Sequence, residues 1–563
     1  MSSRARLVTI SSLLFTYLAT SYHGSPTIST YLGTFAAFAL LQGFLIGVWS
    51  IILYPNFFSP LRHLPSPKDG NSWFMGQFKI IRALPSGYPH RQWIRDVPNE
   101  GIIRYNGPLN QERLFITGGK ALAEVLVHRN YDFDKPSEVK TFLGRILGVG
   151  VLVAEGEEHK KQRRNLMPAF AFRHIKDLYP VFWRIGRGGV QVMTQSIFAD
   201  VNKENNKPEG AVEAVAGREN TAVIEVGNWA SRATLDIIGV AGLGRDFNSI
   251  NDPHNEINET YRTVFQPSRQ AQFLNLLSLF LPAFVIRNIP VQRNNDIDSA
   301  AKMIKSVCRE LVVEKKEKLA RNELTDVDIL SVAIESGEFS DDDLVNQLMT
   351  FLAAGHETTA SAMTWAIYML SRYPEVQKRL RQEIRENLPS PNGDQDVDSM
   401  QIDRLPYLNA VCNEVLRYYP PVPMTVRETV RDTSILGHPI PKGVRVILAP
   451  AATNLDTEQW GPDAAEFNPD RWIAKDEGDR SAASGGAISN YSYMTFLHGP
   501  RSCIGQSFAK AEFACLLAQW VGRFEFELYN KEEEDEDKVL IKGGITARPA
   551  KGMYVYAKVV DGW

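Results

Sequence analysis

Cysteine is scarce in this sequence and shows no pairing. The 563 residues contain four, Cys308, Cys412, Cys503 and Cys515, at spacings typical of neither disulfides nor zinc sites. This favours a reduced, cytosol-facing protein over a disulfide-stapled secreted one. An excess of positive charge is also absent, since 62 Lys and Arg residues stand against 65 Asp and Glu, which argues against nucleic-acid binding. Internal repeats, a flavin motif and a strand-linked dinucleotide fingerprint are missing as well.

Two apolar, uncharged stretches stand at the N-terminus. Residues 7–24 suit a signal-peptide core or a first membrane span, and residues 31–54 are long enough to cross a bilayer. Basic residues follow only the second stretch (Arg62, Lys68, Arg82), so the positive-inside rule places the remaining chain in the cytosol. If both stretches span, they form a hairpin with both ends cytosolic; if only the second spans, Met1 is lumenal. We predict a membrane anchor over residues 1–54 and disfavour a buried core helix.

A proline-rich segment separates this anchor from the body of the chain. Pro55, Pro60, Pro65 and Pro67 lie within residues 55–70, where fixed φ angles and missing amide donors favour a stiff hinge. The rest, residues 71–563, is rich enough in apolar residues to build a large core. Short β-like runs are predicted at residues 102–105, 114–117 and 444–448, and a buried helix at residues 223–244.

One cysteine stands in a loop whose composition indicates chemistry. Residues 496–505 read Phe-Leu-His-Gly-Pro-Arg-Ser-Cys-Ile-Gly, and an apolar helix pattern follows. Gly499 and Gly505 are expected to let the backbone fold around Cys503, with amide groups and the following helix start favouring the thiolate. A thiolate held in this way suits heme iron, because its electron donation favours O–O cleavage. The alternative is a small buried cysteine in a tight turn.

A second stretch predicts a long helix with costly polar residues inside it. Ser340 and Asp343 are spaced as a capping box, and an apolar helical pattern runs on to Tyr373-Pro374. Its middle reads Ala-Ala-Gly-His-Glu-Thr-Thr over residues 353–359. Small residues leave room for a diatomic molecule, and an acid next to an alcohol can move protons. The alternative for a single Thr here is a hydrogen bond to its own helical turn.

The spacing Phe-x-x-Gly-x-Arg-x-Cys-x-Gly, joined to the acid–alcohol pair, resembles the cytochrome P450 family, microsomal type. The resemblance covers residues 55–563 in order and implies a mainly α fold with small β regions. It implies heme b with Cys503 as the axial thiolate and metal ligand and Arg501 on a propionate. It also implies roles for further residues, with Glu357 and Thr358 as the catalytic proton-delivery pair and Phe496 and Gly505 as parts of the heme-binding loop.

Other residues acquire roles only through this resemblance. The family usually places Trp and Arg four apart on a helix to bind a propionate; here these positions hold His159 and Arg163, and a solvated basic face is the alternative. Arg427 is implied to approach a propionate. Glu-x-x-Arg is weak by itself, but it resembles part of the family's structural triad, which here comprises Glu414, Arg417 and Arg471.

Three further segments are expected near the heme or the substrate, and two at the surface. Residues 131–156 are expected to be an apolar loop over the heme, and residues 273–289 a lid that dips into the membrane surface or packs in the core. The tip of a hairpin at residues 543–546 is expected to reach substrate. Residues 200–220 and the acidic run 530–538 are expected to be solvated.

The implied activity is monooxygenation with O2 and with NADPH electrons from NADPH–cytochrome P450 reductase, cytochrome b5 being a second possible donor. Residues 160–164 form a hypothetical docking face for the acidic reductase. The anchor implies the endoplasmic reticulum membrane, with the catalytic body facing the cytosol, and a lipophilic substrate. The loop and the hinge look like those of filamentous-fungal members that tailor terpenoids or polyketides. The alternatives are fatty-acid or xenobiotic hydroxylation and a non-oxygenating heme-binding protein.

Overall fold

Helices make up most of the structure, a computed structural model that describes residues 3–22, 27–83, 85–198, 213–215, 217–265, 268–277, 281, 283–323, 328–476, 481–542 and 544–563. The α-helices are α1 (Ser3–Ser21), α2 (Ile28–Val48), α3 (Phe78–Ala83), α4 (Tyr88–Asp96), α5 (Gly119–Ala123), α6 (Ser137–Leu147), α7 (Gly156–Leu166), α8 (Phe172–Lys176), α9 (Tyr179–Phe198), α10 (Val226–Ile237), α11 (Glu256–Phe265), α12 (Arg269–Leu277), α13 (Ala283–Arg287), α14 (Gln292–Ala320), α15 (Ile329–Glu335), α16 (Asp341–Arg372), α17 (Pro374–Asn387), α18 (Ser399–Asp403), α19 (Pro406–Tyr418), α20 (Pro450–Thr453), α21 (Thr457–Trp460) and α22 (Gln506–Arg523). The strands are β1 (Ile102–Asn106), β2 (Glu112–Ile116), β3 (Phe133–Asp134), β4 (Glu213–Ala214), β5 (Thr221–Glu225), β6 (Thr425–Thr429), β7 (Thr433–Ile435), β8 (His438–Ile440), β9 (Arg445–Leu448), β10 (Phe524–Leu528), β11 (Ile541–Lys542), β12 (Arg548–Pro549) and β13 (Tyr554–Val559).

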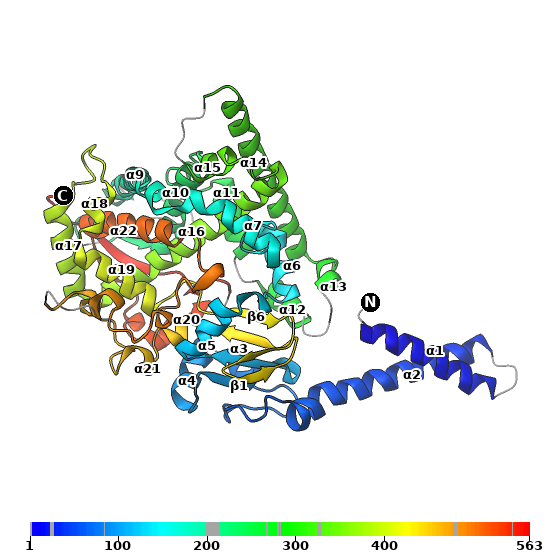
Figure 1. Ribbon diagram of the computed structural model, residues 1–563. Coiled ribbons are helices and arrows are strands. Elements are labelled where there is room, and N and C mark those ends of the chain that lie inside the picture. The colour runs from blue at the N-terminus through cyan, green and yellow to red at the C-terminus, as the bar shows by residue number, and fades with distance from the viewer. Residues whose placement is uncertain are drawn as a thin grey trace.

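Helix α16 lies in the interior of the body, and α10, α14 and α22 pack against it (Figure 1). It begins with the predicted capping box: the Asp343 amide donates to Ser340 Oγ at 3.2 Å, and the Ser340 amide donates to Asp343 Oδ2 at 3.2 Å. It ends at Arg372, just before Pro374. Its middle and C-terminal turns are almost wholly buried, and they form the centre of the largest hydrophobic cluster.

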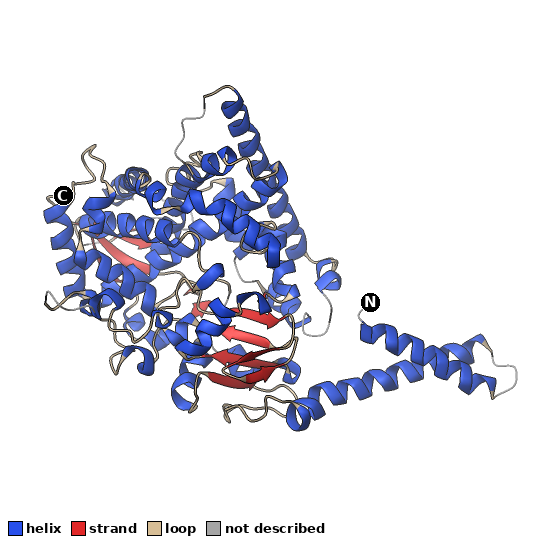
Figure 2. Ribbon diagram, in the orientation of Figure 1, coloured by secondary structure: helices blue, strands red, loops and turns tan. Residues whose placement is uncertain are grey.

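The β regions are small and lie at two places on the helical body (Figure 2). The larger sheet, in the order β1-β2-β9-β6-β3, lies beside the base of the N-terminal helices, and β2 and β9 are its parallel pair. A second sheet has the order β10-β13-β5-β4. The strands predicted near residues 102–105, 114–117 and 444–448 are confirmed as β1, β2 and β9, and so is the mainly α fold class.

The two N-terminal helices pack against each other and project away from the body (Figure 1). The rings of Phe15 and Phe38 stack at 5.4 Å, and Gln42 Nε2 donates to Ser12 Oγ at 3.1 Å. α2 runs on as a π-helix over Trp49–Phe58. The combined helix, Ile28–Phe58, is long and apolar enough to cross a membrane, and no other helix among the described residues is. It is a candidate membrane anchor.

Pro55 lies inside this helix instead of opening the hinge. It cannot donate an amide hydrogen bond, and close to it the side-chain amide of Asn110 donates to the Ile51 carbonyl at 2.8 Å. Arg104 Nη2 donates to the Pro55 carbonyl at 2.7 Å. These contacts join the end of the helix to the first sheet, and the helix ends at Phe58, with turns over residues 60–63.

Two segments differ from the expected local structure. The expected loop over residues 131–156 contains the helix α6, whose buried residues Ile146 and Leu147 face the core. The helix expected over residues 223–244 begins as strand β5 and becomes helical only at Val226, because Glu225 caps α10 by accepting from the amides of Gly227 and Asn228. Most of the expected insertion at residues 200–220, and Gly543 of the expected hairpin, lie outside the described residues.

Candidate functional site

A cavity of about 860 Å³ lies between α16 and the loop that carries Cys503. That volume is within the range of small-molecule sites, about 300–1,000 Å³. Most of the lining is apolar, and the segment before β6 contributes Val422 and Met424. The sequence-predicted residues that line the cavity are Cys503, Arg501, Phe496, Gly505, Glu357, Thr358, Arg163, His159 and Arg427. The structure therefore brings the two predicted motifs to one site.

The backbone around Cys503 turns sharply at Gly499. Its φ is +75°, and a Cβ added there would lie 2.1 Å from the Leu126 carbonyl oxygen, so only glycine fits. The Cys503 amide donates to the Phe496 carbonyl at 2.9 Å and closes the turn. Gly505 differs from the expectation: its φ is −89°, and an added Cβ would meet only Phe170, at 3.8 Å. Its backbone conformation therefore does not require glycine.

Cys503 lies in the interior of the protein, and its exposed surface faces the cavity. Burial raises the pKa of its thiol, while the Gly505 amide and the Arg163 guanidinium act in the opposite direction. The expected amide contribution toward the thiolate is present, and Arg163 adds to it, but burial outweighs both. A metal cation on the cavity side would also favour the thiolate.

The opposite wall of the cavity is the middle of α16. Thr358 Oγ1 donates to the Ala354 carbonyl at 2.9 Å, the local hydrogen bond weighed as the alternative for this residue. Ala354 is exposed to the cavity. Gly355 serves close packing as well, because a Cβ there would lie 2.7 Å from Ile238 Cγ1. α16 is continuous through these residues.

Glu357 and Thr359 have partners that the sequence did not indicate. Glu357 is 6% exposed, and its Oε2 lies 2.8 Å from Arg548 Nη2 on β12. Thr359 Oγ1 donates to Glu512 Oε2 on α22 at 2.9 Å. Burial raises the pKa of Glu512 well above its ordinary value, while the hydrogen bond from Thr359 acts in the opposite direction. Neither partner belongs to a motif, and each lies more than 150 residues in the sequence from the α16 residue that it contacts.

Basic side chains gather at one end of the cavity. Arg501 Nη2 lies 2.6 Å from Glu155 Oε2 and 2.9 Å from Asp134 Oδ1. Lys135 Nζ lies 3.3 Å from Glu155 Oε1. Burial, followed by the repulsion of Arg501, lowers the pKa of Arg427 to about 10, and burial and Arg427 lower that of Lys135 to about 8. We call Lys135, Arg163, Arg427 and Arg501 the cationic cluster; sequence reasoning missed Lys135.

His159 belongs to the same region but adds no charge. It is buried, and its Nδ1 lies 3.1 Å from the Tyr131 hydroxyl. Burial, together with the cations around it, lowers the pKa of His159 to about 4, so the imidazole is neutral at pH 7. The Arg163 guanidinium donates to the Ser502 carbonyl and lies 3.3 Å from Ser502 Oγ. It thus ties α7 to the cysteine loop.

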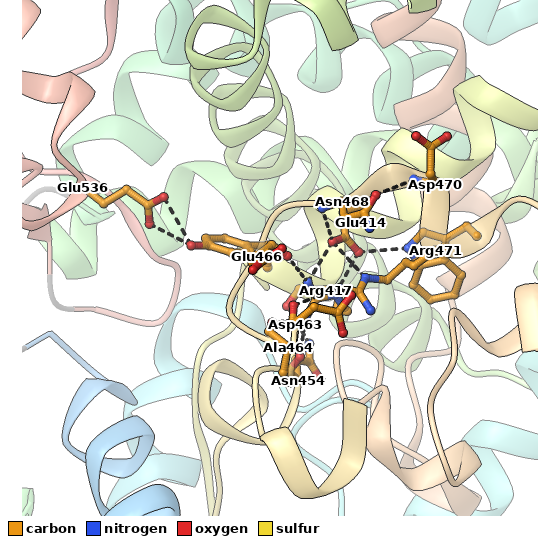
Figure 3. Close-up of polar contacts among 12 residues, drawn as sticks. Glu414, Arg417, Asn454, Asp463, Ala464, Glu466, Asn468, Asp470, Arg471 and Glu536 are labelled. Atoms are coloured by element: carbon orange, nitrogen blue, oxygen red, sulfur yellow. Dashed lines mark hydrogen bonds and ion pairs between the residues drawn. The ribbon is translucent and has the colours of Figure 1, made fainter. Parts of the chain in front are cut away.

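The three residues of the predicted triad meet in the core (Figure 3). Arg417 Nε and Nη2 donate to both oxygens of Glu414, at 2.8 and 2.7 Å, and Arg471 Nε donates to Glu414 Oε1 at 3.2 Å. Glu414 and Arg417 are fully buried. Arg417 also donates to the carbonyls of the segment before Arg471, at Asn454 (2.9 Å), Ala464 (2.6 Å) and Glu466 (2.8 Å). The cluster joins α19 to the chain that leads into the cysteine loop.

The acidic run at residues 530–538 is not wholly solvated as expected. Glu536 accepts from the hydroxyls of Tyr418, at 3.1 Å, and Tyr419, at 2.9 Å. Arg372 at the end of α16 also pairs with it. The run therefore contributes one anchored carboxylate to the core region.

A helical body with one cysteine facing an apolar cavity, and an acid–alcohol pair opposite, defines a class of oxygen-activating heme–thiolate protein. The sequence model of the family described as Cytochrome P450 matches residues 101–555. The chain belongs to the cytochrome P450 family.

Individual relatives extend the match over nearly the whole chain. It is 45% identical over 557 residues to cytochrome P450 monooxygenase sphH of Aspergillus fumigatus, covering 97% of each chain. It is 44% identical to cytochrome P450 monooxygenase ALT8 of Alternaria alternata, covering 92% of each. It is 43% identical to cytochrome P450 monooxygenase FUM15 of Gibberella moniliformis, covering 96% of this chain and 95% of that one. The chain is accordingly an oxidoreductase of the P450 monooxygenase type.

The residues present fit the heme that the family implies. Heme b carries two propionates, and the four members of the cationic cluster outnumber their two neighbouring carboxylates, Asp134 and Glu155, by two charges. Arg501 Nε is buried without a hydrogen-bond partner among the described atoms. Buried cations without full compensation are costly unless an anion joins them. The cavity thus offers a sulfur ligand on one wall and an anion site at one end.

Proposed function

We propose that this chain is a membrane-anchored heme–thiolate monooxygenase that oxidises a lipophilic small molecule in fungal secondary metabolism. The observation that carries the proposal is the single cavity shared by Cys503, the cationic cluster and Glu357–Thr358. A carrier or sensor needs no proton-donating pair, which disfavours a non-oxygenating heme-binding role. The fungal monooxygenases that this chain resembles support the biological setting.

The proposed reaction uses one O2, one NADPH and one proton for each substrate. One oxygen atom enters a C–H bond as a hydroxyl, and the other leaves as water with the two electrons of NADPH. Thiolate-ligated heme supplies the O2 activation when bound. Cys503 would bind the heme iron through its sulfur and would thereby acquire the thiolate character that burial opposes. Arg501, Arg427, Arg163 and Lys135 would hold the propionates.

The protein's own residues supply the protons for the water that forms. Glu357 is the acid closest to Thr358 along α16, and both side chains line the cavity. We assign Glu357 to passing protons inward and Thr358 to holding the hydrogen-bonded position next to the reacting oxygen, once its hydroxyl leaves the Ala354 carbonyl. His159 is assigned a neutral hydrogen-bonding role at the propionate end.

The lining of the cavity supports a lipophilic substrate. Phe142 and Leu152 from the α6 region, Leu274 from α12, and Ile545 from the C-terminal hairpin surround it. Such a surface excludes water and binds apolar carbon skeletons. We propose a terpenoid or polyketide intermediate as the substrate and keep a fatty acid or a xenobiotic as the second candidate.

The N-terminal helices and the lid support a membrane location. Ile28–Phe58 would cross the endoplasmic reticulum membrane and leave residues 71–563 on the cytosolic side. The exposed apolar residues Phe273 (52%) and Phe284 (70%) on α12 and α13 would contact the lipid surface. Electrons would come from NADPH–cytochrome P450 reductase, with cytochrome b5 as a second donor, at the basic face of α7.

Reconstitution with the reductase tests this proposal. Terpenoid, polyketide and fatty-acid compounds are screened for a shift of the heme spectrum, and bound compounds are incubated with NADPH under ¹⁸O2. The expected result is a product carrying one labelled oxygen, absent without NADPH or reductase. Spectral binding without any oxygenated product would contradict the proposal and favour a binding role. Labelled product from fatty acids alone would select the second candidate.

A further inference from the structure

Glu357 is held by a residue that belongs to neither motif. Arg548 Nη2 lies 2.8 Å from Glu357 Oε2 and donates to the Glu357 backbone carbonyl at 3.0 Å. The side chains of Glu357 and Arg548 are 8% and 22% exposed. One guanidinium nitrogen therefore fixes both the carboxylate and the peptide group of the same residue.

No other cation of the described residues lies within 4.0 Å of this carboxylate. His356 Nε2 is 3.9 Å from Glu357 Oε1, but His356 Nδ1 lies 2.8 Å from the Leu352 carbonyl and must donate its proton there. With the proton of the imidazole on Nδ1, Nε2 presents a lone pair. Burial lowers the pKa of His356, and Glu357 acts in the opposite direction. Tyr261 stacks edge-on against that imidazole at 4.8 Å. The charge of Glu357 is thus balanced by Arg548.

Arg548 belongs to a segment that touches the cavity. The cavity is lined by Gly544, Ile545 and Thr546, which precede Arg548 by two to four residues. Between them, the Ala547 carbonyl accepts from Ser361 Oγ at 2.7 Å and from Trp365 Nε1 at 2.8 Å, both on α16. The segment is therefore docked on α16 by two hydrogen bonds that do not involve Glu357.

We propose that Arg548 is a positioning residue for proton delivery, holding the Glu357 carboxylate at the cavity wall from the segment that lines the substrate space. A buried carboxylate without its cation would turn away or take up a proton, and either change slows the passage of protons. The proposal rests on the proton-delivery role assigned to Glu357 above. Substrate contact at residues 544–546 is thereby linked to Glu357 through the two residues that follow, Ala547 and Arg548.

The test compares Arg548→Gln, Arg548→Lys, Glu357→Gln and the control Ser361→Ala in the full-length holoenzyme with reductase. NADPH oxidation is measured without substrate and with dodecanoic acid as the probe, in H2O and in D2O. The reduced CO spectrum, the thermal midpoint and hydrogen exchange of residues 544–549 report whether each variant is folded and docked. Ser361→Ala removes a hydrogen bond between the same segment and the same helix without touching Glu357.

We expect Arg548→Gln and Glu357→Gln each to slow NADPH oxidation by roughly tenfold or more and to enlarge the D2O effect, with CO spectra and hydrogen exchange unchanged. Arg548→Lys should recover part of the rate, because it keeps the charge. Ser361→Ala should retain the wild-type rate and D2O effect.

The outcomes separate this inference from the role of Glu357. A slow Glu357→Gln beside a wild-type Arg548→Gln would overturn the role of Arg548 and leave that of Glu357 standing. A wild-type rate in Glu357→Gln would overturn the proton-delivery role itself. Equal slowing in Ser361→Ala would show that docking of the segment, and not the ion pair, controls the rate.

Discussion

Replacing Glu414 with Gln should destabilise the protein far more than breaking an exposed ion pair of the same length. Glu414 accepts two hydrogen bonds from Arg417, one from Arg471, one from Trp472 Nε1 at 2.9 Å and one from the Asn468 amide at 2.8 Å. The side chains of Arg417 and Arg471 are 0% and 5% exposed. Gln keeps the shape but leaves two buried guanidinium groups without their shared anion.

Breaking a buried pair by removing one partner costs about 3–5 kcal/mol. The matched control is Arg309→Gln, which breaks a pair with Asp342 that is also 2.7 Å long but has side chains 55% and 77% exposed. Exposed pairs contribute about 0–1 kcal/mol. Urea unfolding of the detergent-solubilised chain, followed by circular dichroism and heme absorbance, gives both free energies. If Glu414→Gln lowers the free energy of unfolding by no more than Arg309→Gln does, the view that Glu414 neutralises both arginines is refuted.

Three further predictions concern the site and the fold. Thr358→Ala should divert NADPH electrons from product to H2O2 while substrate binding persists; unchanged H2O2 yield would contradict the role of its hydroxyl. Burial and Arg113 lower the pKa of His90 from 6.5 to about 3. The free energy of unfolding should therefore fall as the pH drops below about 6.5, by at most about 1.4 kcal/mol per pH unit. His90→Phe should reduce this pH dependence in unfolding measured at pH 7 and pH 5. Gly499→Ala should lower the thermal midpoint and Gly505→Ala much less, because only the first forces a Cβ against a carbonyl at positive φ; equal midpoints would contradict the loop geometry.

Features set by neighbouring residues were predictable from the sequence. The capping box of α16 involves residues three apart, and the paired strands β1 and β2 are joined by a short turn. The gathering of Cys503 with Glu357 and Thr358 was implied by the resemblance to the cytochrome P450 family. Each of the two motifs that carry this resemblance is a local pattern within one stretch of chain.

Features set by distant partners were not predictable. Arg548 meets Glu357 across 191 residues, and no spacing rule selects that arginine among the others. Glu225 is the last residue of strand β5 and the N-cap of α10. The hydrophobic pattern alone predicted one helix over residues 223–244. Pro55 lies inside a helix although it has no amide proton. The side-chain amide of Asn110, 55 residues further along the chain, donates to the nearby Ile51 carbonyl. Tertiary hydrogen bonds decided each of these cases.

The most direct test of the account is the absorption spectrum of the membrane-bound protein, reduced and with CO, for wild type and Cys503→Ala. The wild type should show the red-shifted Soret band characteristic of thiolate ligation, and the variant should lack it. No such band in folded, heme-supplemented wild-type protein, or its persistence in Cys503→Ala, would contradict the assignment of Cys503 as the axial ligand.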